Sequence, residues 1–330
     1  MNLGEENVPN NEELAIERLH KLVRSIFQRD YALNPAPVRR PFHAKSHGCV
    51  SAFFTIDQDI PDDFRVGVFK VPRTYSSWIR FSNASALIQS DWKLDGRGMS
   101  IKLVDVAKDE SLENERHKLM QDFVMINHPV FFVRNAMDFA EFSSRITSPS
   151  LPLSFFFGWN PLKWRVHEFI TLVKTGLKWV SSPLAIQYWS QTPYKLGSKA
   201  IKFSAKPCSF HNKGIISFGH DRLRQAMTVQ LQEEVRFEFL IQVQKCATRM
   251  PVEDATIVWP ESVSEYKRLA TIKIPPQDFN TTQRLQFDEN LSFAPWHSLA
   301  EHRPIGGINR ARRSVYELMS ELRHQMNHLE

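Results

Sequence analysis

The sequence predicts a globular α+β fold with a helix near each end and short β-rich runs between them. Of its 330 residues, 42% are hydrophobic and 24% are charged, so the chain has enough apolar material for a large core. This length corresponds to about two average domains, or to one large β-barrel that takes up most of the chain. The composition excludes a mainly disordered protein and a small scaffold held by disulfide bonds.

The first segment, residues 1–34, is predicted to be a tail followed by a helix. Residues 1–11 are acidic and polar and lack the apolar stretch of a secretory signal. From Glu12 to Arg29, apolar residues recur near helical spacing. The prolines in Asn34–Pro41 then indicate an extended arm, and the core of the protein is expected over residues 35–330.

From Gly48 onward the pattern changes to short β-rich runs that are broken by turn residues. The runs expected to form strands are Val50–Ile56, Phe64–Val71, Ser77–Ser82, Met99–Val104, Ile201–Ala205, Phe237–Val243 and Leu269–Ile274, and Phe123–Ile126 and Val130–Val133 continue the apolar pattern. Asp95–Gly98 is expected to be a turn. Helices are expected over Met137–Ile146 and over Asn309–His328, the latter capped by Asn309.

Residues 151–189 form an insertion that is rich in Phe, Trp, Pro and Lys. Within it, apolar residues recur at helical spacing from Leu162 to Val180, and the opposite side is mostly basic. Two interpretations are open. The helix over residues 162–180 either lies in a membrane interface, as a peripheral contact, or packs its apolar side on its own barrel.

The net charge and the cysteine content limit which binding partners and which cellular compartment are expected. The net charge is +6, and the basic residues are scattered among 36 acidic ones without a nucleic-acid-binding motif, so no nucleic acid partner is expected. The three cysteines are widely spaced and form no CxxC motif, which argues against a zinc or dithiol site. No run of about 18 uncharged apolar residues is found. A cytoplasmic location is expected, with membrane association if the interfacial interpretation holds.

Arg312, Tyr316 and Arg323 share one face of the predicted C-terminal helix, because their spacings of four and seven residues place them within about 40° of one another. A phenol beside a guanidinium has a lowered pKa, since the cation favours phenolate. Phenolate is a hard ligand that suits ferric iron. On spacing alone, however, an Arg–Tyr pair on a helix is far more often a surface contact.

Several short motifs change this interpretation when they are considered together. They are His43-Ala44-Lys45, Arg80-Phe81-Ser82, Asp95-Gly96-Arg97-Gly98, Asn127-His128-Pro129-Val130-Phe131-Phe132 and Arg312-Arg313-Ser314-Val315-Tyr316. In this order they resemble the catalase superfamily, in particular its small, core-only members, the minicatalases or catalase-related peroxidases, with kinship to the catalase-related allene oxide synthases. The resemblance extends from about residue 35 to residue 325.

The resemblance implies an antiparallel β-barrel with flanking helices that binds ferric heme b. It implies that His43 is the distal acid/base, that Asn127 orients the bound peroxide and that Ser82 holds the distal imidazole. Tyr316 would be the proximal ligand of the heme iron, and Arg312 would keep it as phenolate. The residues implied to contact the propionates or the porphyrin are Arg40, Arg80, Arg323 and Phe139.

The implied activity is that of a heme-dependent peroxidase or catalase-like enzyme that cleaves the O–O bond of a hydroperoxide. Organic or fatty-acid hydroperoxides are favoured, because residues 151–189 could lie near acyl chains, and hydrogen peroxide is a close second. The implied activities include isomerisation or dehydration of the hydroperoxide. A homo-oligomer is one assembly considered for the protein. Phe42 and His128 depart from the catalase pattern, which argues against fast dismutation of hydrogen peroxide. The alternative is a non-catalytic heme-binding or peripheral membrane protein on the same fold.

Overall fold

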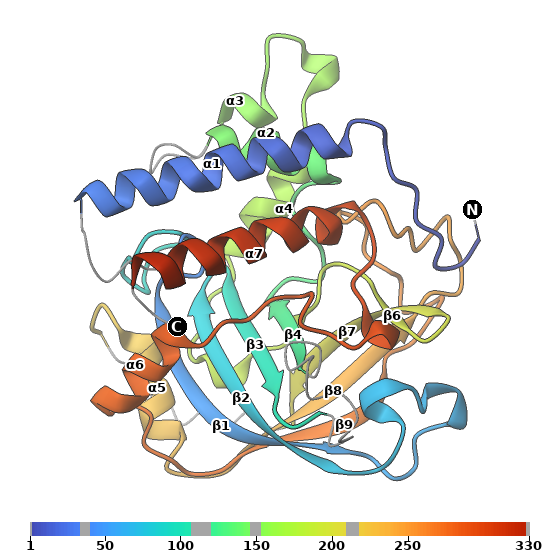
Figure 1. Ribbon diagram of the computed structural model, residues 1–330. Helices are drawn as coiled ribbons and strands as arrows, with labels where there is room; N and C mark the ends of the chain where they lie inside the picture. Colours follow the sequence, from blue (N-terminus) through green and yellow to red (C-terminus); the bar gives the residue numbers. More distant parts are fainter. Residues whose placement is uncertain (1, 34–39, 107–119, 146–152, 209–217, 328–330) are drawn as a thin grey trace.

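The computed structural model describes residues 2–33, 40–106, 120–145, 153–208 and 218–327, which form a β-barrel with helices on its outside (Figure 1). The strands are β1 (Ser46–Ile56), β2 (Thr74–Asn83), β3 (Arg97–Leu103), β4 (Gln121–Ile126), β5 (Tyr188–Trp189), β6 (Tyr194–Leu196), β7 (Lys199–Pro207), β8 (Val235–Val243) and β9 (Lys267–Ile274). The helices are α1 (Glu12–Leu33), α2 (Ala136–Arg145), α3 (Leu153–Phe156), α4 (Val166–Gly176), α5 (Arg222–Gln230), α6 (Thr282–Asn290) and α7 (Gly307–Met326).

The described strands form one antiparallel sheet in the order β5-β4-β3-β2-β1-β9-β8-β7-β6. The sheet closes because β5 pairs with β4 on one side, through Trp189 and Ile126, and with β7 on the other, through Tyr188 and Ala205. Eight strands therefore form the barrel, and β6 lies beside β7. The predicted α+β class and antiparallel barrel are confirmed.

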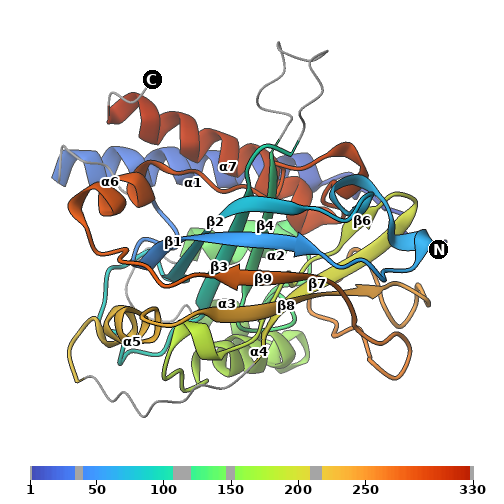
Figure 2. The same ribbon diagram turned by 90° about the horizontal axis from the view of Figure 1, so that it is seen from below.

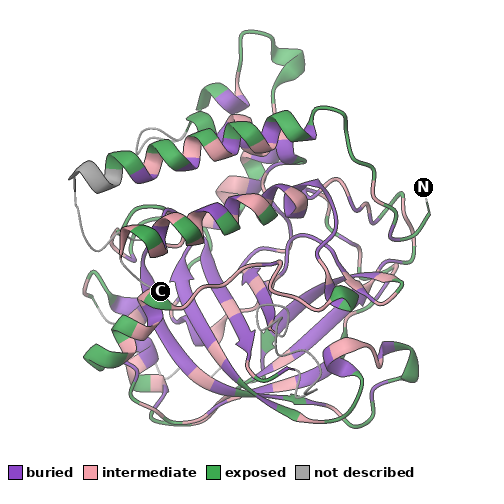
Figure 3. Cartoon of the chain, viewed as in Figure 1, coloured by how far each residue is buried: buried purple, intermediate pink, exposed green. Residues whose placement is uncertain are grey.

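Aromatic side chains fill the barrel interior, which accounts for much of the high phenylalanine content. Side chains alternate between the two faces of a strand, so every second residue points inward. The ring of Phe123 lies 4.7 Å from that of Phe239 and 5.2 Å from that of Phe203, and Phe54 lies 5.0 Å from Phe239. All four residues are buried, as are most residues of the barrel strands (Figure 3). A ligand site must therefore lie outside this packed interior.

Helix α7 lies between the barrel and α1 (Figures 1 and 2). Ala311, Val315 and Leu318 recur at helical spacing and pack with residues of α1 and α2 in one apolar cluster. The opposite side of α7 faces the outer surface of the barrel. Because α1 shares a core with α7, it covers the helix that carries the predicted iron ligand. The division of the chain at residue 34 stays a prediction.

Most of the expected strands are present, with small shifts at their ends, but two local predictions are wrong. Phe64–Val71 is not a strand: it forms two short turns of helix, and Gly67 between them has φ +55°, which an extended strand does not allow. Val130–Val133, where only an apolar pattern is predicted, is irregular. Gly306, not Asn309, precedes α7, and the amide of Asn309 donates to the carbonyls of Pro193 and Ile305 at 2.8 and 3.0 Å.

The helix expected over residues 162–180 is shorter, and only part of its apolar surface packs on the protein. Only Val166–Gly176 is α-helical, and Glu168, Thr171 and Thr175 form its buried side. Its apolar residues divide between two sides: Phe169 and Leu172 pack against a buried apolar cluster, as the packed interpretation expects, whereas Val166 and Ile170 face solvent. Among the described residues, no helix is long and apolar enough to cross a membrane. Parts of the expected extended arm, of the Met137–Ile146 helix and of the insertion, and the helix end at His328, lie outside the described residues.

Candidate functional site

A cavity of about 620 Å³ lies between the outer face of the barrel and α7. Its floor includes Arg80, Ser100 and Val124, which are direct cross-strand neighbours on β2, β3 and β4. Their neighbours in sequence point into the barrel core, so these three side chains point outward. The rest of the wall comes from residues 40–43, from residues 292–297 and from α7 between residues 313 and 323. This volume is in the usual range for a small-molecule or cofactor site.

Five of the predicted site residues line this cavity within the described part of the chain, and the others do not. The five are Arg40, His43, Arg80, Tyr316 and Arg323. Ser82 contacts His43, whereas Asn127, Arg312 and Phe139 lie outside the lining. The fold therefore brings together residues from both ends of the chain.

His43 has a constrained position at the start of β1. Its φ is +55°, a left-handed conformation that is uncommon for a non-glycine residue. Its Nδ1 lies 3.0 Å from the Ser82 hydroxyl. Gly98 makes room for this pair: a Cβ there would lie 2.8 Å from His43 Nδ1 and 2.9 Å from Ser82 Oγ. Three strands thus fix one orientation of the imidazole ring.

The His43 imidazole is neutral at physiological pH. Burial lowers its pKa to about 3, with further contributions from the positive charges of Arg80 and Arg312. A neutral imidazole has one nitrogen that can accept a proton. Since Nδ1 is engaged with Ser82, Nε2 is the nitrogen available to a substrate.

Arg40, Arg80 and Arg323, which we call the arginine cluster, lie together at one side of the cavity. Nε of Arg80 donates to the Asp288 carboxylate at 2.8 Å, and Nη2 of Arg80 donates to the His43 carbonyl at 3.0 Å. Arg323 donates to Ser292 Oγ at 2.7 Å. Burial lowers the pKa of Arg40 to about 9, and repulsion from Arg80 and Arg323 adds to the effect. The cluster therefore carries more positive charge than its surroundings neutralise.

Two buried donors lack a hydrogen-bond partner in the described part of the chain, one in the cavity lining and one outside it. One is Nη1 of Arg40, which lies 3.8 Å from the Asp288 carboxylate without a hydrogen bond. The other is Nδ2 of Asn127, whose Oδ1 accepts from the backbone N–H of Arg97 at 2.9 Å. An unpaired buried donor is costly, so such a group often serves a ligand.

Arg312 and Phe139 differ in position from what the resemblance implied. The Arg312 guanidinium lies over the ring of Phe131, 5.0 Å from its centroid, and approaches Thr192 Oγ1 to 3.4 Å. It is one turn before Tyr316 on α7, and its role toward the phenol stays a prediction. Phe139 meets Phe131 edge to face at 5.6 Å, between two apolar clusters near α2.

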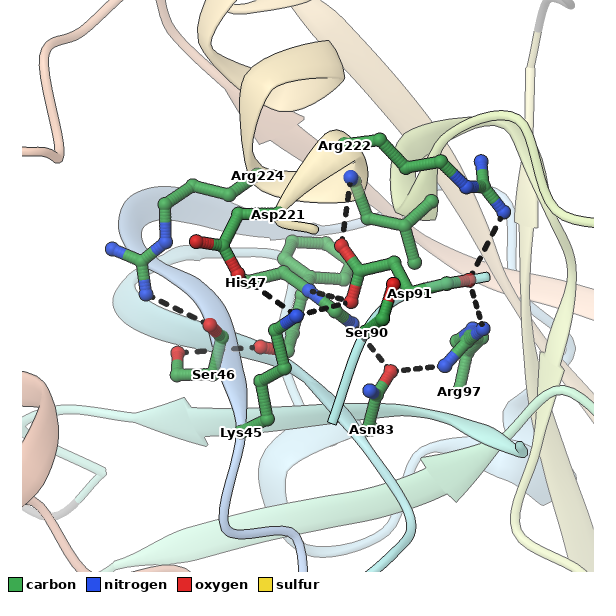
Figure 4. Close-up of polar contacts among 12 residues, drawn as sticks. Lys45, Ser46, His47, Asn83, Ser90, Asp91, Arg97, Asp221, Arg222 and Arg224 are labelled. Atoms are coloured by element: carbon green, nitrogen blue, oxygen red, sulfur yellow. Dashed lines mark hydrogen bonds and ion pairs between the residues drawn. The ribbon is translucent and has the colours of Figure 1, made fainter. Parts of the chain in front are cut away.

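A buried polar network supports the strand ends that carry the site (Figure 4). His47 Nε2 lies 2.7 Å from Asn83 Oδ1, and the Arg97 guanidinium also donates to that oxygen. Lys45 forms ion pairs of 2.8 Å with both Asp91 and Asp221. These residues adjoin Ala44, Ser82 and Gly98 in sequence, so the network holds β1, β2 and β3 in fixed relation beside the His43 pocket.

Several lining residues could not be identified from the sequence. Ser100 and Val124 are recognisable only once the strand register is known. Asp288 belongs to α6, which carries no clear periodic signal, yet it is buried and binds both Arg40 and Arg80. His297 lines the cavity and lies 3.0 Å from Asp122. Motif order identified Arg40, His43, Arg80, Tyr316 and Arg323 but not Ser100, Val124, Asp288 or His297.

No protein-family model matches this sequence, and no curated protein sequence matches it. Among solved structures, its fold is similar to that of catalase A from Saccharomyces cerevisiae, with a TM-score of 0.68 and 18% identity over 92% of this chain and 65% of that chain. A fungal catalase has a TM-score of 0.65 and 16% identity over 92% of this chain and 63% of that chain. A bacterial catalase has a TM-score of 0.64 and 15% identity over 97% of this chain and 62% of that chain.

The chain therefore spans less than two thirds of the length of these catalases. At this identity the likeness shows a shared fold, the antiparallel barrel with flanking helices. The motif resemblance implies a heme group, and the chemistry of the cavity residues is compatible with one. A phenol and a neutral imidazole line one cavity, and an arginine cluster with an unpaired donor suits carboxylate groups.

Proposed function

We propose that this protein is a heme-dependent oxidoreductase of the catalase type that cleaves the O–O bond of a hydroperoxide. The observation that carries the proposal is the joint presence of His43, Tyr316 and the arginine cluster around one cavity. The catalase-like fold supports it. The finer kinship with minicatalases and allene oxide synthases rests on the motifs alone.

In this proposal, the cavity holds heme b. Tyr316 would be the proximal ligand of the iron, Arg312 would favour its phenolate form, and the arginine cluster would pair with the propionates. Phe139 would pack near the porphyrin edge. When bound, ferric heme would supply an iron centre that exchanges electrons with the peroxide. The excess positive charge at Arg40 would offset the cost of burying two carboxylates.

His43 would act as the acid/base group of the reaction. Because its pKa is lowered to about 3, the imidazole would be neutral at neutral pH, and with Nδ1–H donating to Ser82 Oγ, its Nε2 would accept the proton of the hydroperoxide oxygen. His43 would then give this proton to the far oxygen, which would leave as water or as an alcohol, with the electrons for O–O cleavage supplied by the bound heme. Ser82 keeps the ring oriented, and the unpaired Nδ2 of Asn127 would donate to the bound peroxide.

For the substrate, we propose an organic or fatty-acid hydroperoxide, with hydrogen peroxide as the second candidate. Phe42, Phe293 and Met319 give the cavity wall apolar surface that suits an alkyl chain. The product of such a substrate is an alcohol or a rearranged or dehydrated fatty acid. A fatty-acid hydroperoxide should have a much lower KM than hydrogen peroxide, and equal KM values would remove the reason for this preference.

The experiment that tests the proposal compares heme-reconstituted wild type with His43→Ala on both substrates. Loss of the general base should lower kcat/KM by about 10²–10⁴-fold while the heme content stays the same. His220→Ala, which changes an exposed histidine away from the cavity, is the matched control and should retain full activity. Full turnover in His43→Ala would instead support a non-catalytic heme-binding protein.

We also propose that the protein is a homo-oligomer and works in a reducing, cytoplasmic environment. Cys49, Cys208 and Cys246 are free thiols, which fits such a compartment. Light scattering on the purified protein tests the first part, and fractionation of the source cells tests the second. A strictly monomeric protein, or one recovered outside the cytoplasm, would contradict the respective statement.

A further inference from the structure

An exposed apolar surface covers α4 and the segments on both sides of it, and we call it the α4 face. Its members are Trp159, Leu162, Trp164, Val166, Ile170, Leu177 and Trp179, all of them exposed. Trp159 and Leu162 are almost fully exposed, at 107% and 95%. They belong to the connection between α3 and α4, which reaches outward beyond α1 (Figures 1 and 3). Large apolar surfaces of this kind mark interaction sites.

Helix α4 exposes one apolar stripe to solvent, although Phe169 and Leu172 beside that stripe pack against the protein. Val166, Ile170 and Leu177 fall within about 40° of one another on a helix of 3.6 residues per turn. This apolar stripe faces solvent, at 45%, 44% and 56% exposure, whereas the polar stripe opposite to it is buried. A helix whose only purpose is to cover the barrel would bury this stripe as well.

The buried polar side of α4 makes specific contacts, although neither oxygen of the Glu168 carboxylate has a hydrogen-bond partner among the described residues. Arg134 Nε lies 2.6 Å from the Glu168 carboxylate. The hydroxyls of Thr171 and Thr175 donate to carbonyls of their own helix at 2.9 and 2.8 Å. Turning the apolar stripe inward would leave the Glu168 carboxylate without this partner.

The surface continues past the C-terminal end of α4. The ring of Trp179 lies 5.4 Å from that of Trp92, which in turn lies 6.5 Å from that of Phe218. All three side chains are exposed. A Cβ added at Gly176 would lie 3.7 Å from Leu94, so the exposed Leu94 adjoins the helix as well. The α4 face is therefore one continuous surface built from three segments.

Positive charge accompanies the apolar side chains. Lys163, Lys174 and Lys178 are exposed along the α4 face, and the single carboxylate of α4, Glu168, is buried. Arg165 is neutralised by ion pairs with Asp138 and Glu141, both at 2.9 Å. Apolar residues, tryptophans and lysines on one surface are the combination that binds the interface of an anionic bilayer.

We propose that the α4 face docks on an anionic phospholipid bilayer. The tryptophans and the aliphatic stripe would enter the headgroup region, and the lysines would remain at its negatively charged surface. This inference rests on surface geometry and charge, so it holds or fails separately from the proposed heme chemistry. If both hold, the docked face contacts the proposed peroxide-orienting residue Asn127, because Lys178 Nζ donates to its backbone carbonyl at 2.9 Å. The enzyme would then draw hydroperoxides from the bilayer.

The test is flotation of the full-length protein with vesicles of phosphatidylcholine, with and without phosphatidylglycerol. Wild type should float with the anionic vesicles. The variant V166S/I170S/L177S should lose at least about tenfold in binding, because three inserting side chains are gone. The control V71S/V229S/V258S removes three equally exposed aliphatic side chains elsewhere, at 54%, 48% and 54% exposure, and should bind like wild type.

The charge contribution is tested with K163Q/K174Q against the control K21Q/K70Q, whose lysines are exposed and distant in sequence. Each lysine near the surface should contribute about fivefold in affinity, so only the first pair should weaken binding to anionic vesicles. Wild type that fails to float would overturn the proposal. So would sedimentation showing that V166S/I170S/L177S dissociates a wild-type oligomer while vesicle binding is unchanged, because a second copy would then occupy the face.

Discussion

At the scale of single residues, the site depends on how closely Gly98, Ser82 and His43 approach one another. The sequence motifs identified Ser82 and His43, and the 3.0 Å contact between them agrees with the implied role of Ser82. The need for Gly98 was not visible, because a glycine before a strand is usual in turns. Only the strand register shows that β3 brings its backbone against the imidazole.

Gly98→Ala should therefore impair turnover without preventing heme binding. The added Cβ would lie 2.8 Å from His43 Nδ1, so the ring must move out of its reactive position. We expect kcat to fall by about 10²-fold, the loss typical of a misplaced catalytic group, with an unchanged Soret intensity. Gly158→Ala is the control, because a Cβ there meets no atom within 4 Å. Equal activity of the two variants would contradict the role given to Gly98.

At the scale of elements, the structure explains why some predictions succeeded. Strands that alternate between core and outer face, such as β2 and β8, have a clear sequence signal. The strand predicted over Phe64–Val71 is absent because Gly67 interrupts it with a positive φ. Helices α5 and α6 were not predicted because they have too few apolar residues to show a helical period. For α4 the helical period was right, but buried contacts of its polar side decide which side faces the protein.

Helix α6 contributes one carboxylate that stabilises the arginine cluster. Asp288 is almost fully buried and lies 2.8 Å from Arg80 Nε and 3.8 Å from Arg40 Nη1. Asp288→Asn would leave buried guanidinium charge without its partner, which typically costs about 3 kcal/mol in the free energy of unfolding. Urea denaturation of the heme-free protein measures this loss. Asp59→Asn, at an exposed position, should stay within about 0.5 kcal/mol of wild type.

At the scale of the whole molecule, burial of neutral histidines makes the fold sensitive to acid. Burial is the main cause that lowers the pKa of His43 and His47 to about 3 and of His302 to about 4. The unfolded chain binds protons at these positions from about pH 6.5 downward, whereas the folded protein does not. Stability is therefore complete above pH 6.5 and is lost progressively as the pH falls toward 3.

Chemical denaturation at pH 7 and pH 5 should show this dependence. Each of the three histidines is expected to contribute about 1–2 kcal/mol to the difference in the free energy of unfolding. His302→Gln, whose amide oxygen can replace Nε2 as acceptor for the Val68 N–H, should have a smaller difference than wild type. If the free energy of unfolding is the same at pH 7 and pH 5, these histidines are protonated in the folded protein at pH 5, which contradicts the prediction.

The overall arrangement of barrel and helices could be predicted more completely than the positions of individual site residues. Motif order along the chain correctly indicated a barrel with flanking helices and placed His43 and Tyr316 at one site. It also assigned Asn127, Arg312 and Phe139 to the site, whereas these three residues lie outside the cavity lining, because loops and the packing beneath α1 determine their positions. The α4 face likewise appears only when all its segments are assembled.

The central claim is that the cavity binds heme with Tyr316 as the iron ligand. The visible absorption spectrum of the purified, heme-reconstituted protein, recorded for wild type and Tyr316→Phe, tests it most directly. We predict a Soret band with ferric high-spin tyrosinate features in wild type and a clearly altered spectrum in Tyr316→Phe. Absence of heme uptake by wild type, or identical spectra for the two proteins, would contradict the account.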